Sequence, residues 1–374
     1  MHRQPEKLRV LLVGPAPADA ASRGGMATVA ALMAAHPDAA LRIAVISTYS
    51  EGSLWHRLSV GSGGMLRATW LVLRRRVGVL HVHLAHGGSV VRKALPLTAA
   101  RLVGVPAVIH AHSYDFGGWY DRLHRVLQWA VRHVLVADRW LVLGERHVGE
   151  YGGRLGVQSG RISVLHNAVR IPDAPTTQTG AETIHAVALG RLGERKGSYD
   201  IVAAVSALPQ PVRERLRVTL AGDGEIDELA ALVTEAGLSD TIHVAGWLDA
   251  QARDELLSAA QVFLLPSRDE GLPMALLEAM AYGLVPVTTL VGSIGEVVSD
   301  RSTGLVVSPG RSEQIAAALS SLVTDDRLRI RLGSAARARA GDFGLDTWYQ
   351  RLSTLWTELA IGSGHRSPSL TERL

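Results

Sequence analysis

Two carboxylates flank a turn that is suited to binding an anion. The segment 266–283 reads PSRDEGLPMALLEAMAYG, with Glu270 in a loop and Glu278 eight residues later on the helix that this pattern predicts. The free amides of Gly271 and Leu272 and of the first helical turn would face an anion at the helix start. A phosphate bound there would lie between two carboxylates, which can accept hydrogen bonds from sugar hydroxyls.

Two cations follow an earlier predicted strand. Arg191 and Lys196 lie in the segment GRLGERKG, and Lys196 is one of only three lysines in the chain. A lysine is a compact point charge that suits a phosphate. No D-x-D triplet occurs in the sequence, so we expect no metal-bridged diphosphate, no metal ligands and no cofactor.

Several segments together resemble a known family. The loop and helix around Glu270 and Glu278 resemble the E-x7-E signature of the retaining glycosyltransferases of family 4, which have the GT-B fold. Other segments resemble this family's motifs in the same order along the chain: GRLGERKG (190–197), VTLAGDGE (218–225), HVAGWLDA (243–250) and VGSIGEVVSDRSTGLVV (291–307). HNA (166–168) partly matches its entry to the second domain, and Ser293 replaces a usual glycine.

The resemblance implies a role for each matching residue. Glu270 would contact the donor sugar as a catalytic residue, and Glu278 would bind the ribose hydroxyls. Glu296 lies in the last motif, and the alternative to a role in the site is a structural role. The remaining donor contacts that the resemblance implies are Arg191, Lys196, Gly271 and Leu272 at the phosphates and Gly246, Trp247 and Leu248 at the ribose and base.

The first half supplies the other candidate residues. Gly24 and Gly25 precede a predicted helix, and in the family such a pair binds the donor phosphates. His112 follows the strand PAVIHAH and matches the family's active-site histidine, whereas His110 would lie in the core or behind it. Three further histidines lie close together in the sequence: His81, His83 and His86. No carboxylate lies near them in the sequence, and this argues against a zinc site.

Two successive series of apolar runs must position these residues. Five buried strands are predicted at 9–14, 42–47, 79–84, 106–112 and 140–144, and five more at 185–190, 217–222, 241–246, 261–266 and 284–289. Helical patterns lie between most of them, which indicates an α/β protein of two doubly wound, Rossmann-like domains facing an interdomain cleft.

This pattern predicts the domain boundaries, and the resemblance implies the role of each domain. We expect an acceptor-side domain at 1–170, a linker at 171–183 and a nucleotide-sugar domain at 184–345. A helix at 346–362 that packs back toward the first domain and a disordered tail at 363–374 would follow.

Charge is distributed unevenly over the 374 residues. Residues 1–170 hold 21 Lys and Arg against 9 Asp and Glu, whereas the remainder holds 18 against 26. The stretch 55–76 combines arginines with Trp55 and Trp70, and 121–135 predicts a basic helix. Such segments can lie on an anionic membrane, or they can be ordinary surface helices. The chain has no cysteine, which excludes disulfides and thiol chemistry and fits a reducing compartment.

These observations predict a cytoplasmic enzyme, at the inner face of the cell membrane if the basic surface binds lipid. The resemblance implies that it transfers a hexosyl group from a UDP- or GDP-sugar to a glycan or lipid-linked acceptor with retention of configuration, in envelope or exopolysaccharide synthesis. No nucleic-acid partner is expected. The alternatives are a catalytically silent nucleotide-sugar-binding subunit, an epimerase of the same fold, and a nicotinamide oxidoreductase, whose G-x-G-x-x-G fingerprint is missing after the first strand.

Overall fold

The computed structural model describes residues 7–17, 24–176, 178 and 182–362. The chain forms two compact units, one of Met1–His166 with Asp346–Leu374 and one of Asn167–Leu345. Part of the expected linker (177 and 179–181) and the expected disordered tail (363–374) lie outside the described residues.

The first unit is built on a parallel sheet of six strands in the order β2-β1-β3-β4-β5-β6. Its strands are β1 (Leu8–Pro15), β2 (Leu41–Tyr49), β3 (Val79–Leu84), β4 (Ala107–Ala111), β5 (Arg139–Val142) and β6 (Ile162–Val164). Its helices are α1 (Gly25–Ala34), α2 (Leu54–Leu73), α3 (Gly88–Val103), α4 (Phe116–Asp121), α5 (Arg125–Val134), α6 (Glu145–Leu155), the short 3-10 helix η1 (Ser159–Arg161) and α14 (Leu345–Gly362).

Helix α14 belongs to the first unit although it is the last element in the part of the chain that the structure describes. The Tyr349 hydroxyl donates to the carbonyl oxygen of Leu32 over 2.8 Å. Ser353 donates to Asp38 over 3.0 Å, and the buried Trp356 contacts strand β3. The chain therefore completes its first unit only after it has built its second.

The second unit repeats the architecture with the strand order β12-β11-β10-β7-β8-β9. Its strands are β7 (Ile184–Leu189), β8 (Leu216–Ala221), β9 (Ile242–Ala245), β10 (Val262–Leu265), β11 (Val285–Thr288) and β12 (Leu305–Val306). Its helices are η2 (Glu194–Lys196), α7 (Ser198–Ser206), α8 (Gln210–Glu214), α9 (Ile226–Glu235), α10 (Ala250–Ala259), α11 (Met274–Tyr282), η3 (Ile294–Glu296), α12 (Ser312–Thr324) and α13 (Asp326–Gly341).

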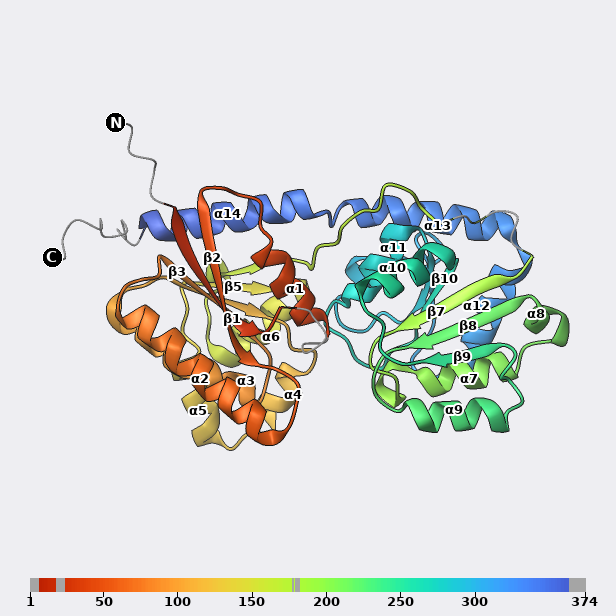
Figure 1. The fold of residues 1–374 in the computed structure, drawn as a ribbon, viewed down its shortest axis with the longest axis horizontal. Helices are drawn as coiled ribbons and strands as arrows, with labels where there is room; N and C mark the ends of the chain where they lie inside the picture. Colours follow the sequence, from red (N-terminus) through yellow and green to blue (C-terminus); the bar gives the residue numbers. More distant parts are fainter. Residues whose placement is uncertain (1–6, 18–23, 177, 179–181, 363–374) are drawn as a thin grey trace. The chain divides into compact units, whose positions relative to one another are not determined.

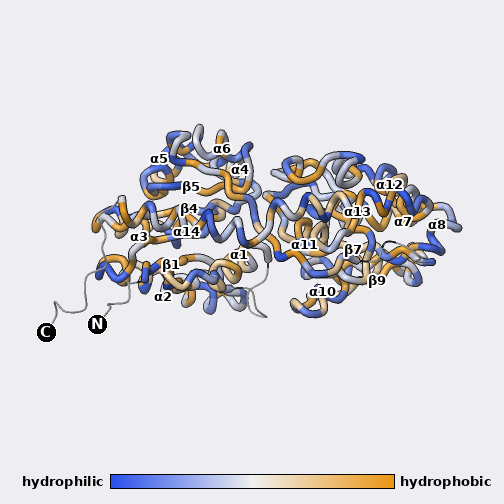
Figure 2. Tube along the Cα trace, turned by 90° about the horizontal axis from the view of Figure 1, so that it is seen from above, coloured by the Kyte–Doolittle hydropathy of each residue, from blue (hydrophilic) through white to orange (hydrophobic). Residues whose placement is uncertain are grey.

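Each sheet has its own hydrophobic core. The strands are rich in Val, Ile, Leu and Ala, and hydrophobic residues run along them in both units (Figure 2). All pairings in the two sheets are parallel, so the carboxyl ends of the strands in each sheet share one edge. This edge is where doubly wound sheets bind ligands.

The structure departs from the predicted elements in three places. The short strands β6 and β12 were not among the ten predicted. The expected helix at 121–135 is wrong in its first turn, because α4 ends at Asp121 and α5 begins only at Arg125. The His124 side chain caps α5 by accepting from the amide of Val126, which makes His124 the residue before the helix.

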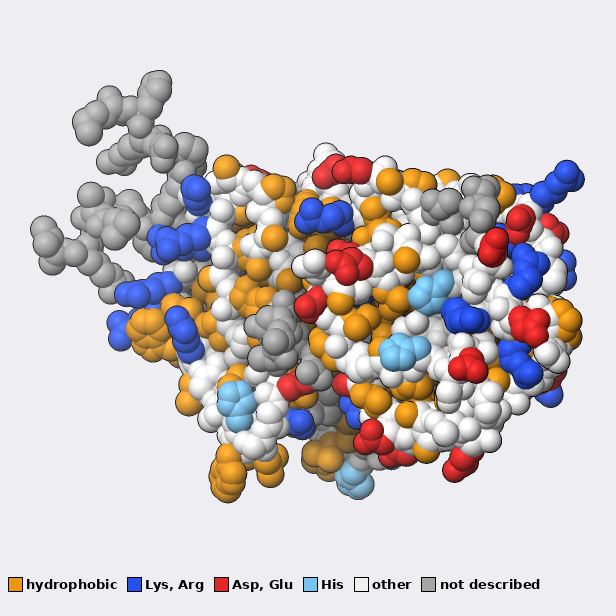
Figure 3. Space-filling view, turned by 45° about the vertical axis from the view of Figure 1, so that its right-hand side comes forward, with side chains coloured by type: hydrophobic (Ala, Val, Ile, Leu, Met, Phe, Trp, Pro, Cys, Tyr) orange, Lys and Arg blue, Asp and Glu red, His pale blue; other side chains and the backbone are white. Residues whose placement is uncertain are grey.

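The charge asymmetry read from the sequence follows the two units. Figure 3 shows one face of the molecule, on which basic and acidic side chains are spread among hydrophobic ones. Basic side chains occur on both sides of this view, so the asymmetry is one of net charge. Residues 1–170 hold 21 Lys and Arg against 9 Asp and Glu, and the remainder holds 18 against 26.

Candidate functional site

The candidate site of the second unit lies where the strand order of its sheet reverses. From β7 the chain adds β8 and β9 on one side, and it then crosses over to add β10, β11 and β12 on the other. The switch point is therefore between β7 and β10. Loops that leave neighbouring strands at such a point diverge and leave room for a ligand.

Lys196 and Glu270 meet at this switch point. Lys196 follows β7 and Glu270 follows β10, and the lysine Nζ forms an ion pair with Glu270 Oε1. The side chains are 15% and 7% exposed. Ser267 Oγ donates to the same carboxylate oxygen over 2.9 Å. The structure thus brings together two residues that the sequence assigned to the donor phosphate and the donor sugar.

The loop before α11 offers unused backbone donors. Within the described ranges, the amides of Gly271 and Leu272 donate no hydrogen bond outside regular secondary structure, and they precede the first turn of the helix. Asn167 Nδ2 donates to the carbonyl oxygen of Leu272 over 2.6 Å. Asn167 is the central residue of the HNA segment, so the partial motif match retains the residue that holds this loop.

A second loop, which contains Gly292 and Ser293, packs against the loop that contains Glu270 and Gly271. The φ of Gly292 is +64°, and a Cβ at this position would lie 2.1 Å from the carbonyl oxygen of Glu270. The Ser293 amide donates to the Gly271 carbonyl oxygen over 2.8 Å. The φ of Ser293 is −101°, which any residue adopts. The departure from the family pattern at this position therefore requires no change of backbone.

Glu278 lies on α11, behind the loop. Its Oε1 is 3.7 Å from Arg253 Nη1 on α10, and its side chain is largely buried. Burial raises the pKa of Glu278, although the Arg253 charge acts in the opposite direction. Arg253 is a residue that the sequence analysis missed, since nothing in a single arginine on a polar helix singles it out.

The other predicted donor contacts lie farther along the same edge. Arg191 is mostly exposed, and its Nη1 is 3.8 Å from Asp223 Oδ2. Gly246, Trp247 and Leu248 follow β9, the outermost strand on that side of the sheet, and the Gly246 carbonyl accepts from the Gly222 amide. Glu296 lies in η3 after β11. These residues follow strands of the same sheet at the edge where the Lys196–Glu270 pair lies.

The first unit carries its candidates at the equivalent edge of its own sheet. Gly24 precedes α1 with a φ of 100°, which favours glycine, and Gly25 is the first residue of the helix. His112 follows β4, and its Nε2 is hydrogen-bonded to Nδ1 of His83 over 2.9 Å. His83 is the second residue that the sequence analysis missed as a site residue, although the H-x-H pattern was its signal.

Three buried histidines have nitrogen atoms close enough to suggest a metal site. The ligand atoms of His81, His83 and His110 lie within 4.8 Å of one another, and His86 is not among them. However, Trp356 Nε1 donates to His81 Nδ1 over 3.1 Å. This nitrogen therefore holds a lone pair, and a neutral His81 carries its proton on Nε2. As arranged, His81 has no free lone pair for a metal.

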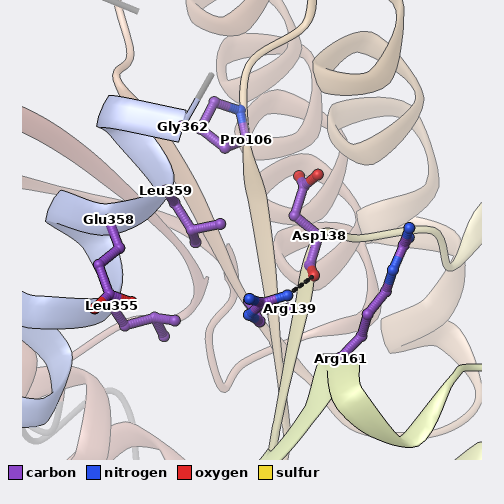
Figure 4. Close-up of a pocket in the computed structure, with 8 residues that line it drawn as sticks. All are labelled: Pro106, Asp138, Arg139, Arg161, Leu355, Glu358, Leu359 and Gly362. Atoms are coloured by element: carbon purple, nitrogen blue, oxygen red, sulfur yellow. Dashed lines mark hydrogen bonds between the residues drawn. The ribbon is translucent and has the colours of Figure 1, made fainter. Parts of the chain in front are cut away.

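A cavity of about 320 Å³ lies in the first unit beside α14 (Figure 4). Pro106 precedes β4, Arg139 begins β5, and Arg161 precedes β6. The cavity therefore opens at the amino ends of these strands, whereas His112 lies at the carboxyl ends. It is not part of the candidate site.

Comparison with known proteins identifies a family model and several relatives. The model for glycosyl transferases group 1 matches residues 177–339. The chain is 30% identical over 308 residues to glycogen synthase of Mycobacterium tuberculosis, covering 78% of this chain and 71% of the relative. It is 27% identical over 309 residues to alpha-D-kanosaminyltransferase of Streptomyces kanamyceticus, covering 77% and 80% of the two chains.

Solved structures share the fold over nearly the whole chain. HepE of Anabaena, solved in complex with UDP-glucose, superimposes with a TM-score of 0.74 at 16% identity. The match covers 94% of this chain and all of that one. At this identity the likeness concerns the fold alone, and it confirms the two doubly wound units that the sequence predicts.

Proposed function

The chain belongs to the family of group 1 glycosyl transferases, and from this membership we propose that it transfers a hexosyl group from a UDP- or GDP-sugar to a glycan or lipid-linked acceptor. The protein is a glycosyltransferase of the GT-B fold. The donor, the retention of configuration and the role in envelope or exopolysaccharide synthesis belong to the proposal. HepE was solved with UDP-glucose, which supports a nucleotide-sugar donor here.

The observation that carries this proposal is the Lys196–Glu270 pair beside the unused amides of Gly271 and Leu272. A diphosphate at this helix start would receive hydrogen bonds from the amides and a positive charge from Lys196. Lys196 would then turn from the carboxylate to the phosphate. Glu270 would be released to accept a hydrogen bond from a hydroxyl of the donor sugar.

The same arrangement explains how the leaving group can be stabilised. Bond cleavage places additional negative charge on the diphosphate, and preorganised donors act most strongly where charge develops. Glu270 is hydrogen-bonded through Ser267 and Lys196, so it is held in a binding geometry. We propose that no enzyme carboxylate attacks the sugar and that transfer takes place on the face that the diphosphate leaves, which retains the configuration.

A donor screen tests the proposal. We expect UDP- or GDP-sugars to raise the melting temperature of the protein and to be hydrolysed slowly without an acceptor. Glu270→Gln keeps the side-chain volume and should abolish hydrolysis. Release of a sugar with the donor's anomeric configuration, followed by NMR, supports retention. Conversion of the donor into a different nucleotide sugar would instead identify an epimerase, and failure of every donor to bind would refute the proposal.

We also propose that the first unit contacts an anionic membrane surface at the inner face of the cell membrane. No helix in the described ranges is long and apolar enough to span a bilayer. Helices α2 and α3 pack against each other, and α3 also contacts α5. The large hydrophobic side chains that these helices expose are Leu54, Trp55, Leu58, Leu66, Trp70 and Leu73 on α2, Val91, Leu95 and Leu102 on α3, and Val126, Leu127 and Trp129 on α5.

Charge around these side chains favours an anionic partner. Residues 52–114 contain eight Lys and Arg and no Asp or Glu. Trp55 is 81% exposed, and Arg74 and Arg76 lie over the ring of Trp70. Exposed aromatic and aliphatic side chains can enter the headgroup region while nearby arginines bind anionic lipid. A lipid-linked acceptor would be available at such a surface.

A further inference from the structure

Four histidines lie on one face of the first sheet. His81 and His83 alternate along β3, His110 lies on β4, and His112 directly follows it. His83 and His110 are register partners across the two strands, so both pairs point to the same side. His81, His83 and His110 are fully buried, whereas His112 is partly exposed. The four rings thus run from the core to the sheet edge.

At the buried end of this row, the direction of the hydrogen bond is fixed. An indole N–H can only donate, so the bond from Trp356 fixes His81 Nδ1 as the acceptor. Burial lowers the pKa of all four histidines, to about 3 for His81 and for His112. Each ring is therefore neutral near pH 7 and has one N–H and one lone pair. In His81 the N–H must be at Nε2.

His83 transmits this polarity to His112. Its Nδ1 shares one proton with His112 Nε2, and its Nε2 is buried without a partner in the described part of the chain. The Nε2 of His81 is likewise buried and unpartnered, and nitrogens of the two rings and of His110 cluster within 4.8 Å. Among the described residues no hydrogen bond joins His81 Nε2 and His83 Nε2, so the two rings can influence each other only electrostatically. In a low-dielectric interior, a lone pair on His83 Nε2 is attracted to the His81 N–H, whereas a second N–H would be repelled by it.

We propose that Trp356, acting through His81 and His83, holds His112 as the tautomer that is protonated on Nδ1. His83 then donates from Nδ1 to His112 Nε2. The remaining nitrogen of His112, Nδ1, is not among the buried unpartnered atoms and makes no hydrogen bond within the described residues. It presents an N–H to whatever binds at this edge. His83 and Trp356 are positioning residues, and His112 is a neutral hydrogen-bond donor.

The assignment deepens the proposed function, on which its catalytic meaning rests. A neutral N–H can bind a hydroxyl oxygen of the sugar or a phosphate oxygen of the leaving group, but it cannot accept a proton at that nitrogen. His112 would therefore stabilise developing negative charge and would not act as a general base through Nδ1.

Nitrogen NMR of the ligand-free protein tests the tautomer directly. With ¹⁵N-histidine labelling and assignment through His112→Gln, two-bond correlations report which ring nitrogen carries the proton. We expect His112 to be protonated on Nδ1 and His81 on Nε2. Trp356→Phe removes the indole donor but keeps an aromatic ring, and it should convert both residues to tautomer mixtures.

Trp348→Phe is the matched control. Trp348 lies on the same helix and is also buried, but its indole nitrogen has no hydrogen-bond partner among the described residues. It should leave both tautomers unchanged. Wild-type His112 protonated on Nε2 would overturn the proposal, and so would unchanged spectra in Trp356→Phe. Stoichiometric Zn²⁺ binding that shifts His81, His83 and His110 would also overturn it, in favour of a metal site.

Activity provides a second readout. Removing one preorganised donor typically lowers kcat by about 10²–10³-fold, so partial loss of the tautomer in Trp356→Phe should lower kcat by a smaller factor, with the KM for the donor unchanged. Because the spectra need no substrate, a correct tautomer without transferase activity would refute only the proposed function. Activity with the opposite tautomer would refute only this inference.

Discussion

Lys196 and Glu270 are each other's charged partner in this structure, and both are largely buried. Under the proposed function, a diphosphate would replace the carboxylate as the partner of Lys196, and a sugar hydroxyl would replace the amine as a partner of Glu270. Donor binding would then be an exchange of partners, and losing either residue would leave the other without its charge complement.

Replacing Lys196 should weaken donor binding strongly. A charge-assisted hydrogen bond contributes roughly 1.5–3 kcal/mol, so we expect Lys196→Ala to lower the affinity for UDP or GDP about ten- to a hundredfold, measured by calorimetry. Lys7→Ala removes an exposed lysine and is the control. The double variant Lys196→Ala/Glu270→Gln removes the unpaired carboxylate and should regain stability but not affinity. Unchanged affinity in Lys196→Ala would exclude Lys196 from the site.

Glu278 should lower the stability of the folded protein at high pH, although it contributes to donor binding in the proposed function. Its pKa is raised in the folded state by burial, so folding favours the protonated form. The stabilising contribution is full below the unfolded pKa and is lost as the pH rises through the folded value. Glu278→Gln should therefore raise the melting temperature at pH 8, with a gain that shrinks toward pH 4, and should weaken donor binding. A lower melting temperature at pH 8 would contradict this account.

At the scale of elements, the sequence predicted the strands well because buried parallel strands are continuous apolar runs. The ten predicted runs coincide with ten of the strands within a residue or two. It missed β6 and β12, which have only three and two residues. It also missed partners such as Ser267, Arg253 and Trp356, since the sequence alone does not show which side chains from distant segments meet.

The contact between two loops gives a prediction at this scale. A Cβ on Gly292 would collide with the Glu270 and Gly271 carbonyl oxygens, and its φ is positive. Gly292→Ala should displace the loop that carries the free amides and lower donor affinity by at least tenfold. In Gly295→Ala the added Cβ meets nothing closer than 3.9 Å, so this variant should bind normally. Equal affinities in calorimetry would show that the loops adjust independently.

Donor phosphates at this edge need no metal ion if backbone amides and cationic side chains neutralise their charge. The site offers Lys196, Arg191 and the amides of Gly271 and Leu272. We therefore expect hydrolysis of the donor to continue in EDTA at an unchanged rate. A complete loss in chelator that manganese or magnesium restores would contradict the metal-free proposal.

At the scale of the whole molecule, the two units differ in net charge. Vesicle flotation tests whether the protein binds an anionic membrane. We expect the wild-type protein to float with anionic vesicles at low salt and to be released near ~0.5 M salt, where screening is strong. Trp55→Ser with Leu58→Ser and Leu66→Ser should abolish flotation. Ile361→Ser on α14 removes an aliphatic side chain that is more exposed than Leu58 and Leu66, and it should not abolish flotation. A wild-type protein that stays at the bottom of the gradient refutes the membrane proposal.

The basic segment 122–132, which begins at the residue that caps the end of α4 and includes most of α5, should matter less than the sequence suggests. Arg122 pairs with Asp115, and Arg132 donates to the Tyr120 hydroxyl and to the carbonyl of Arg154. These guanidinium groups already have partners in the protein. Replacing Arg122, Arg125 and Arg132 with Ser should therefore reduce vesicle binding only partly, with donor hydrolysis near normal. Complete loss of flotation would make the segment 122–132 the main contact.

The late return of α14 to the first unit also imposes an order on synthesis. The ribosome makes β3 and β4 long before Trp356, so the histidine face stays uncovered while the whole second unit is translated. At about 5–20 residues per second, that interval lasts on the order of ten seconds or more. The nascent first unit must wait for α14, whereas the second unit is already complete by then. A premature stop codon after the second unit would thus release a chain with one finished unit and one open sheet.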